Sequence, residues 1–243
     1  MSRKLELSIA AILAVILLLS HVVDRRQQLP DFAAIDDVQA RKQAFIDYLQ
    51  PIVEDINSRR AAERKLLQSM HESLLAGKQL SYLQRRQLKI WAQRYDVDFQ
   101  PDQMLANVEA LLLHLDQIPA SMVIAQAAME SAWGTSRFVT GGYNFFGQWC
   151  YKEGCGMVPG ERQQGASHEV KKFSSTRDAL YAYFRNINSH PAYRQLRKLR
   201  AQARAAGKVL SGLELVAGLQ KYSQRGKAYI DDLRAVIRFN NLE

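Results

Sequence analysis

The chain has 243 residues, of which 47% are hydrophobic and 23% are charged. This ordinary globular composition, with only 13 glycines and 6 prolines, excludes a disordered or collagen-like chain. Lys and Arg number 33 against 24 acidic residues, and the net charge of +9 favours an anionic partner: nucleic acid, anionic lipid or an acidic wall polymer.

An apolar segment near the N-terminus helps to choose among these partners. Residues 7–23 carry no charged side chain, and charged residues flank them on both sides. A helix of this length rises roughly 25 Å, close to the ~30 Å hydrocarbon core of a bilayer. The sequence predicts a signal anchor at residues 1–26 in preference to a cleaved signal peptide, because Ser20-His21-Val22 is a poor cleavage site. An exported body argues against nucleic acid as the partner.

The next segment, residues 27–100, has the pattern of a helical spacer. Apolar side chains recur at helical spacing through its first half, and Pro51 is expected to kink this helix or to start a new one. Gly77 is expected to end the helix, and Ser81 to cap the following one. Nothing in this segment indicates catalysis. The apolar positions are Phe45, Tyr48, Leu49, Ile52, Val53 and Ile56.

The remaining residues, 101–243, contain the features that indicate chemistry. An Ala-rich helix is expected to end at Gly134, and Glu130 lies among apolar neighbours about one turn before that end. Gln126 and Trp133 share its face of the helix. Burial and the negative end of the helix dipole both raise the pKa of such a carboxyl group, as a general acid requires. Spacing alone leaves open a solvated or arginine-paired glutamate.

Cys150 and Cys155 are the only cysteines, in the segment WCYKEGC. Two cysteines cannot build a structural zinc site alone, and the five histidines are scattered without an HExxH motif. In an oxidising compartment this pair favours a small local disulfide, whereas a cytosolic chain would keep two free thiols.

The segments from Glu130 onward resemble a known family. QAAMESAWG at residues 126–134 and NFFG at residues 144–147 resemble the signature of the glucosaminidase domain, whose members are lysozyme-like hydrolases that cut peptidoglycan. Residues 170–196 resemble the family's strand and helix, and residues 219–237 resemble its closing segment. Four matches in one order are more specific than any single motif. The apolar N-terminus, the KYSQRGKAY segment and the cysteine pair look most like the bacterial Bax-type proteins.

The resemblance implies a mainly α fold of the lysozyme-like α+β kind. A helical catalytic domain at residues 101–243, with a small β-hairpin lobe, would follow the membrane helix and the spacer. The implied activity is that of an endo-β-N-acetylglucosaminidase, which hydrolyses β-1,4 glycosidic bonds after N-acetylglucosamine in peptidoglycan. No cofactor and no metal are expected. The expected partners are peptidoglycan strands and, through the N-terminal helix, the inner membrane, with the body in the periplasm or released there after signal cleavage.

Glu130 matches the family's general acid, and the resemblance implies a second carboxylate in the β-lobe. Glu161 falls nearest to the family's position, Glu169 ranks second, and Glu153 is pinned between the cysteines. A distant second carboxylate suits water activation with inversion of configuration. If it never approaches, the acetamido group of the substrate is the alternative nucleophile, so the mechanism stays open.

Tyr222 matches the family's active-site tyrosine, which would orient the acetamido group. The sequence departs from the usual Tyr-Ala-Thr-Asp-Pro here, because it reads Tyr222-Ser223-Gln224-Arg225-Gly226 and its next tyrosine comes one residue late. The local geometry is therefore an open question. The residues expected to bind substrate are Gln126, Trp133, Tyr143, Asn144, Phe146, Trp149 and Tyr229; single aromatic residues are more often part of a core.

The last 53 residues, from Pro191 onward, contain 11 Lys or Arg against 4 Asp or Glu. A basic helix at residues 194–208 is expected to be a solvated face, or a surface that steers anionic glycans or lipids. Two rival functions remain. One is lytic transglycosylation, which needs a single acid/base glutamate. The other is a membrane-tethered wall-binding scaffold without turnover.

Overall fold

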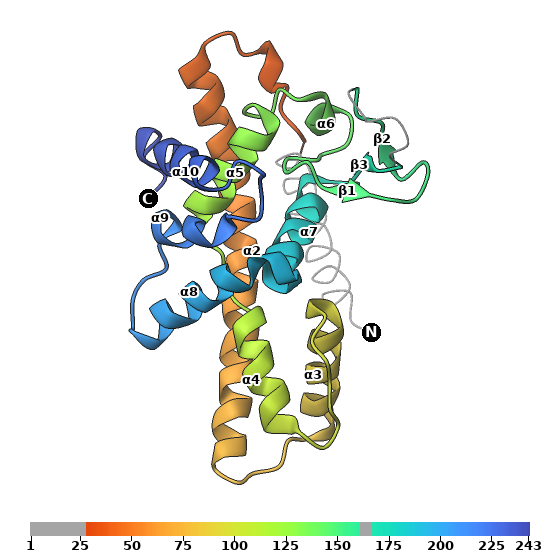
Figure 1. The fold of residues 1–243 in the computed structure, drawn as a ribbon, viewed down its shortest axis with the longest axis vertical. Coiled ribbons are helices and arrows are strands. Elements are labelled where there is room, and N and C mark those ends of the chain that lie inside the picture. Colours follow the sequence, from red (N-terminus) through yellow and green to blue (C-terminus); the bar gives the residue numbers. More distant parts are fainter. Residues whose placement is uncertain (1–27, 161–166) are drawn as a thin grey trace, which may run out of the picture. The chain divides into compact units, whose positions relative to one another are not determined.

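The computed structural model describes residues 28–160 and 167–243 (Figure 1). The predicted anchor at residues 1–26 and the predicted second carboxylate, Glu161, lie outside the described residues. The chain divides into two compact units, Met1–Asp31 and Phe32–Glu243, and every element below belongs to the second. Within the described ranges, no helix combines the length and apolar character that a membrane crossing requires.

A single long helix, α2, runs from Val38 to Leu75, after the short 3-10 helix η1 (Phe32–Ala34). Asp37 caps its start by accepting a hydrogen bond from a backbone N–H of the first turn. The prediction that a new helix starts at Pro51 is wrong, because α2 continues through that residue. Its apolar stripe is buried on both sides of the proline, and this tertiary packing maintains the helix where Pro51 removes one hydrogen bond.

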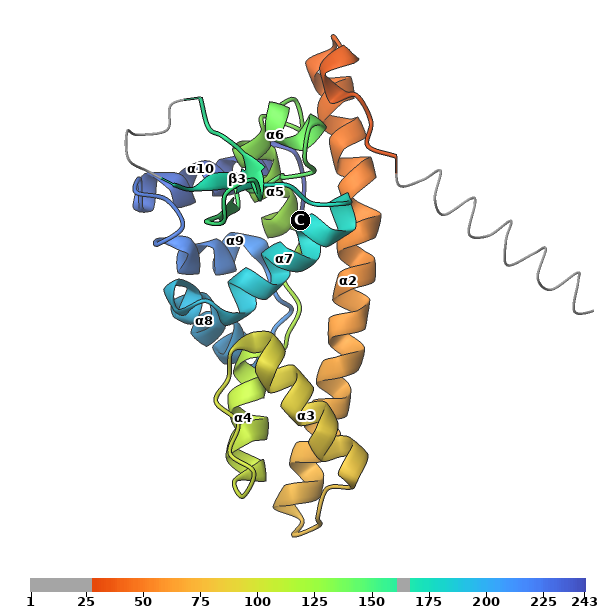
Figure 2. The ribbon, with the colours of Figure 1, turned by 90° about the vertical axis from the view of Figure 1, so that its right-hand side faces the viewer.

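Two shorter helices, α3 (Tyr82–Tyr95) and α4 (Met104–His114), lie beside the C-terminal half of α2 (Figures 1 and 2). Ser81 caps α3 as predicted, and Gln84 returns a hydrogen bond to complete a capping box. The three helices share one apolar core, which contains Leu67, Met70, Leu80, Leu88, Trp91, Tyr95, Val108, Leu111 and Leu115.

Helix α5 (Ala120–Ser131) is the central helix of the other half. Every residue from Ser121 to Ala128 is buried, because α5 is surrounded by α2, α9 (Gly212–Leu215) and α10 (Lys227–Phe239). The helix ends in two residues with left-handed backbone, Ala132 and Trp133. Gly134 follows with φ +82°, and a Cβ atom there would meet the ring of Phe32 at 2.3 Å.

A small lobe follows the short helix α6 (Arg137–Thr140). It holds the strands β1 (Trp149–Cys150), β2 (Gly156–Met157) and β3 (Glu169–Lys171). Their order is β1-β3-β2, with both pairs antiparallel. The β-lobe is thus a three-stranded sheet in which the last strand is central, and the expected mainly helical fold with a small β element is confirmed.

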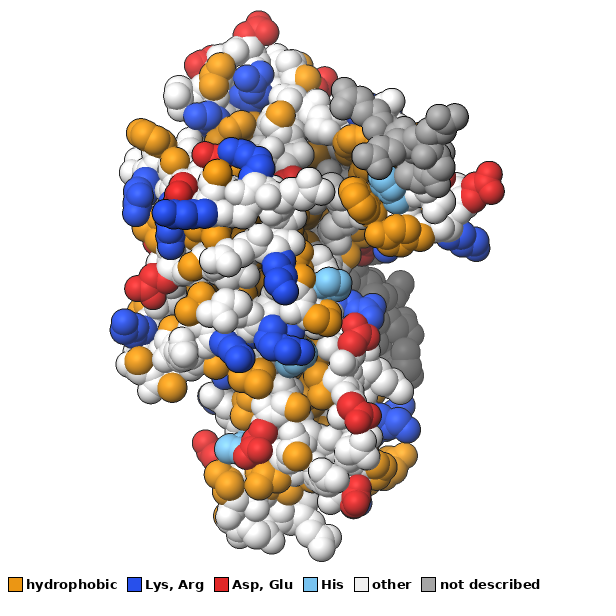
Figure 3. Space-filling model, in the orientation of Figure 1, with side chains coloured by type: hydrophobic (Ala, Val, Ile, Leu, Met, Phe, Trp, Pro, Cys, Tyr) orange, Lys and Arg blue, Asp and Glu red, His pale blue; other side chains and the backbone are white. Residues whose placement is uncertain are grey.

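The chain continues through α7 (Thr176–Ser189), η2 (Pro191–Tyr193), α8 (Arg194–Ala205) and η3 (Val216–Leu219). The expected solvated basic face of α8 is confirmed only in part, since Arg194 and Lys198 are exposed but Arg197 and Arg200 are 5% and 1% exposed. Arg200 donates to the carbonyl oxygens of Gln117 and Leu113, so it fixes the link between α4 and α5. Other basic side chains are scattered over the face formed by α8, α9 and α10 (Figure 3).

Candidate active site

Glu130 lies in the last turn of α5, where the sequence predicts a general acid. Its side chain is open to solvent, yet the protein around the carboxyl group displaces enough water to raise its pKa. The hydroxyl of Tyr229, on α10, donates a hydrogen bond of 2.8 Å to Oε1 of Glu130 and opposes that rise. Within the described residues, Glu130 forms no salt bridge.

Behind this contact runs a chain of buried hydrogen bonds. Gln126 is fully buried one turn before Glu130, and its Nε2 donates to the hydroxyl of Tyr229 at 2.9 Å. The hydroxyl of Tyr183, on α7, donates in turn to Oε1 of Gln126. We call Tyr183, Gln126, Tyr229 and Glu130 the hydrogen-bond chain. It joins three helices and fixes the position of the hydroxyl that meets the carboxylate.

The Tyr229 hydroxyl is suited to be a permanent donor. Burial first, and the charge of Glu130 next, raise the pKa of Tyr229 above its usual range. The hydroxyl therefore keeps its proton to a higher pH than an ordinary tyrosine and remains a hydrogen-bond donor to Oε1 of Glu130.

Tyr222, the predicted active-site tyrosine, lies beside Tyr229 and, among the described residues, forms no hydrogen bond to Glu130. Its ring is parallel to that of Tyr229, with centroids 5.5 Å apart and 4° between the planes. Its hydroxyl donates to the carbonyl oxygen of Phe146 at 3.0 Å. Tyr229 is thus the tyrosine in hydrogen-bond contact with Glu130, while Tyr222 supports its ring and ties it to the loop before the β-lobe.

Two of the residues expected to bind substrate are occupied by structural contacts. Phe146 is 3% exposed and stacks on Tyr183 with centroids 4.0 Å apart. Asn144 is 2% exposed; its amide nitrogen donates to the carbonyls of Gln148 and Lys171, and its amide oxygen accepts from two backbone N–H groups. Asn144 therefore shapes the loop that leads to β1.

The other aromatic residues lie nearer to the surface. Trp149 is 56% exposed and stacks on His168 of the β-lobe, with centroids 4.2 Å apart. Trp133 is half-buried and lies against α2, with the ammonium group of Lys42 5.1 Å from its ring centroid. Tyr143 is half-buried, with a left-handed φ of 53°. Trp149 thus offers the most open aromatic surface among the predicted sugar-binding residues.

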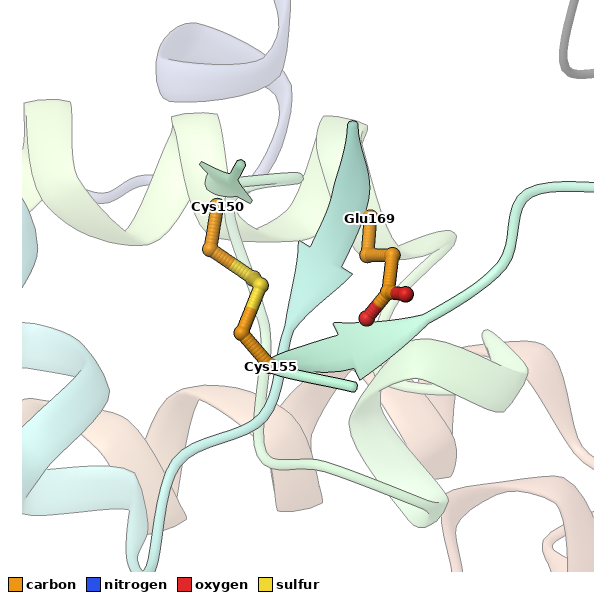
Figure 4. A group of neighbouring side chains, drawn as sticks. All are labelled: Cys150, Cys155 and Glu169. Carbon is orange, nitrogen blue, oxygen red and sulfur yellow. A yellow bond between two sulfur atoms is a disulfide. The ribbon is translucent and has the colours of Figure 1, made fainter. Parts of the chain in front are cut away.

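The β-lobe is fixed by a disulfide between Cys150 and Cys155 (Figure 4). The carboxylate of Glu169 lies beside it and accepts hydrogen bonds from the N–H groups of Gly154 and Gly156, at 3.0 and 2.7 Å. These contacts commit Glu169 to holding the turn, while Glu153 is exposed in that turn. The two sulfur atoms and one carboxylate oxygen of Glu169 lie within 4.8 Å of one another, but disulfide sulfurs are not the thiolates that metals bind.

Sequence reasoning missed Tyr183. It belongs to an apolar stripe of α7 that also contains Ala179, Leu180, Phe184 and Ile187, all of them buried. A tyrosine in such a stripe has the pattern of a core residue. Its only polar signal is the need of a buried hydroxyl for a partner, and that need does not identify Gln126.

Two comparisons relate the chain to known proteins. Residues 110–242 match the family model Glucosaminidase, described as mannosyl-glycoprotein endo-beta-N-acetylglucosaminidase. The chain is also 35% identical over 217 residues to Protein bax of Escherichia coli (strain K12), an alignment that covers 89% of this chain and 76% of that protein. No solved structure gave a significant match.

Proposed function

The chain belongs to the glucosaminidase family, and from that premise we propose that it hydrolyses the β-1,4 bond after N-acetylglucosamine in peptidoglycan, with Glu130 as the general acid. One observation supports the role of Glu130 above all others. It is a solvent-accessible carboxyl group with a raised pKa, held by a tyrosine hydroxyl whose own pKa is raised. A general acid has to be protonated before the reaction and placed within reach of the leaving oxygen.

The hydrogen bond from Tyr229 gives the two carboxyl oxygens of Glu130 different roles. Oε1 accepts this bond, and none of the hydrogen bonds found among the described residues reaches Oε2. We therefore assign Oε2 as the atom that carries the proton and transfers it to the glycosidic oxygen. Tyr229, Gln126 and Tyr183 position the carboxyl group.

The reaction also requires a nucleophile on the opposite face of the sugar, which a second carboxylate provides by activating a water molecule. We keep Glu161 as the predicted second carboxylate, because the carboxylate of Glu169 is already engaged by two backbone N–H groups. If Glu161 is dispensable, the acetamido group of the substrate takes that role.

The test is Glu130→Gln, which preserves shape and removes the acid. The variant is expected to fold and bind glycan while releasing soluble fragments from peptidoglycan roughly 100-fold more slowly, the usual scale for loss of general acid catalysis. Glu109→Gln, a change of the same kind at an exposed position of α4, is the control. Comparable rates for the parent and Glu130→Gln would refute the assignment.

A second candidate, lytic transglycosylation, is favoured by one feature. Among the described residues no second carboxylate shifts the pKa of Glu130, and the groups whose pKa its charge raises are tyrosines. A single glutamate is sufficient for that reaction. Product analysis separates the two activities, since hydrolysis leaves a reducing end and transglycosylation leaves an anhydro-muramyl end. If the purified chain binds glycan and yields neither product, it is the wall-binding scaffold.

We also propose that the protein works in the bacterial cell envelope. The uncharged run at residues 7–23 and the disulfide support export to an oxidising compartment. Fractionation of cells separates the two forms, because an anchored chain stays with the inner membrane and a cleaved one is soluble in the periplasm. Recovery of the active protein in the cytosol would contradict both.

A further inference from the structure

A cavity of about 490 Å³ opens between α2, α3 and α7. Four arginines line it: Arg59, Arg60, Arg94 and Arg185. The cavity wall contains one carboxylate, Glu63. We call this cavity the arginine pocket. No residue of the hydrogen-bond chain lines it.

The floor of the arginine pocket is rigid. The Arg60 side chain is 10% exposed, lies over the ring of Tyr181 with 5.7 Å between its guanidinium carbon and the ring centroid, and pairs with Glu63. Arg94 donates to the other oxygen of Glu63 at 2.9 Å. One carboxylate therefore holds two guanidinium groups side by side, although each of these groups has five N–H donors.

The rim of the pocket is adjustable. Arg59 and Arg185 have side chains 62% and 57% exposed, and they pair with Asp55 at 3.1 Å and with Asp96 at 3.4 Å. Ion pairs this exposed contribute little to stability, about 0 to 1 kcal/mol. Their guanidinium groups can therefore turn toward an anion that enters the pocket.

The charges of the pocket do not balance. Arg177 also pairs with Asp55, so five arginines share three carboxylates, Asp55, Glu63 and Asp96. The carboxyl end of α3 reaches the pocket and adds roughly half a negative charge. An excess of more than one positive charge remains in a concave site, where the field of like charges is concentrated.

We propose that the arginine pocket binds an oxyanion with two negative charges, either a phosphate group or a pair of neighbouring carboxylates. Guanidinium groups form bidentate hydrogen bonds with both of these groups, which a lysine pocket would not. The bound anion neutralises the excess charge and joins α2, α3 and α7. This site is separate from the glycosidase function, and its test does not depend on that function.

Inorganic phosphate and succinate are the probes, titrated into the full chain at low ionic strength by calorimetry or NMR. The parent is expected to bind at least one of them saturably, and Arg59→Gln combined with Arg185→Gln is expected to weaken binding by about tenfold or more. Arg225→Gln is the matched control, because Arg225 forms an ion pair of similar exposure with Asp232 outside the pocket. Phosphate binding alone would assign the site to phosphate ligands, and succinate binding alone to carboxylates.

Three results would overturn the proposal. They are no saturable binding of either probe, unchanged binding in the double variant, and an equal loss in Arg225→Gln. Thermal melting checks that each variant is folded. If the double variant melts early, Arg185→Gln alone repeats the comparison, since its partner Asp96 is itself 65% exposed.

Discussion

Two effects of the surrounding protein shift the pKa of Glu130 in opposite directions, and their balance determines the pH at which the carboxyl group loses its proton. Loss of water around the carboxyl group raises its pKa, and the hydrogen bond from Tyr229 lowers it. Because burial is the larger influence, the carboxyl group keeps its proton to a higher pH than an ordinary glutamate. The hydrogen bond from Tyr229 makes the rise in pKa smaller, but it also fixes the position of the carboxyl group.

The first residue-scale prediction concerns Tyr229→Phe. The substitution removes the hydrogen bond that lowers the pKa of Glu130, so the alkaline limb of the pH–rate profile is expected to move to higher pH. Because Oε1 is no longer held, kcat is expected to fall by about tenfold or more. Tyr222→Phe is the control, since it loses only a bond to the carbonyl of Phe146. An unmoved alkaline limb in Tyr229→Phe would show that this contact does not tune the acid.

The second residue-scale prediction compares two glutamates of the β-lobe. Glu161→Gln is expected to lower turnover with little change in glycan affinity. Glu169→Gln is expected to lower the melting temperature, because it removes the charge that accepts two backbone N–H groups, and to retain activity below that temperature. Full activity in Glu161→Gln would favour the acetamido group as the nucleophile.

At this scale the sequence led to Glu130, whose role as the acid stays a prediction, but it did not indicate that Tyr229 and not Tyr222 hydrogen-bonds Glu130. Glu130 could be found because its helix is continuous and its neighbours are local. The choice between Tyr222 and Tyr229 depends on the turn between them, where Gly226 adopts φ +52° and ψ −113° and starts α10 without a side-chain cap. Adding or removing one residue in such a turn changes which tyrosine hydroxyl reaches the carboxylate of Glu130. The periodicity of apolar residues does not predict this.

Among the elements, the link between α4 and α5 is held by side chains from other helices. Asn57 of α2 bonds both the N–H and the carbonyl of Ile118, at 3.0 and 2.8 Å. Asp116 is 2% exposed and pairs with arginines of α2 and α8, the shortest contact being 2.9 Å from Arg204. The link therefore needs few backbone partners of its own, and it sets the point at which α5 begins.

His114, the last residue of α4, gives an element-scale prediction. Burial first, and the charges of Arg197 and Arg200 next, lower its pKa from 6.5 to about 4. Between pH 4 and pH 6.5 the unfolded chain therefore binds more protons than the folded chain. The free energy of unfolding is highest above pH 6.5 and decreases as the pH falls toward 4. The loss is on the order of 2 to 3 kcal/mol.

Urea unfolding of the parent and His114→Gln at several pH values measures this effect. The difference between the two stabilities is expected to change between pH 6.5 and 4 and to be constant above that window. Carboxylates that titrate in the same range cancel in the comparison. A difference that is constant throughout would mean that His114 has an ordinary pKa in the folded protein.

The elements themselves were largely predictable, and their contacts were not. Apolar periodicity locates the helices, and Ser81 caps α3 where expected. The sequence does not distinguish a basic helix whose arginines face solvent from one whose arginines face carbonyl oxygens. Arg197 and Arg200 are buried because Ile187, Leu113 and Gln117 present backbone acceptors to them. The two acceptors of Arg200, Gln117 and Leu113, are 83 and 87 residues away in sequence.

On the scale of the whole molecule, α2 connects the apolar core that it shares with α3 and α4 to the half of the protein that contains α5. Its C-terminal half packs with α3 and α4, and its N-terminal half contacts α5 and α7 (Figure 2). Tyr48 of α2 hydrogen-bonds Thr176 of α7 at 2.6 Å in the interior. Periodicity showed which side of α2 is apolar, but it could not show that the partner is the helix that carries Glu130.

This arrangement predicts the behaviour of a fragment of residues 101–243, the domain expected from the sequence. Without α2 the fragment exposes the apolar side of α5 and leaves the backbone groups of Ile118 without Asn57. It is expected to aggregate or to unfold without a sharp thermal transition, unlike the full chain. Circular dichroism and size-exclusion chromatography compare the two. A monomeric fragment with a cooperative melt would support the predicted boundary at residue 101.

The side-chain amide of Gln126, in the middle of the hydrogen-bond chain, prevents protons from passing along the chain. An amide nitrogen only donates and an amide oxygen only accepts, so Gln126 cannot pass a proton from Tyr183 to Tyr229 as an imidazole or a second carboxyl group would. The interior therefore supplies no proton to Glu130. In the proposed mechanism the acid is therefore recharged after each turnover from the open side, by the water that enters the reaction or by the solvent.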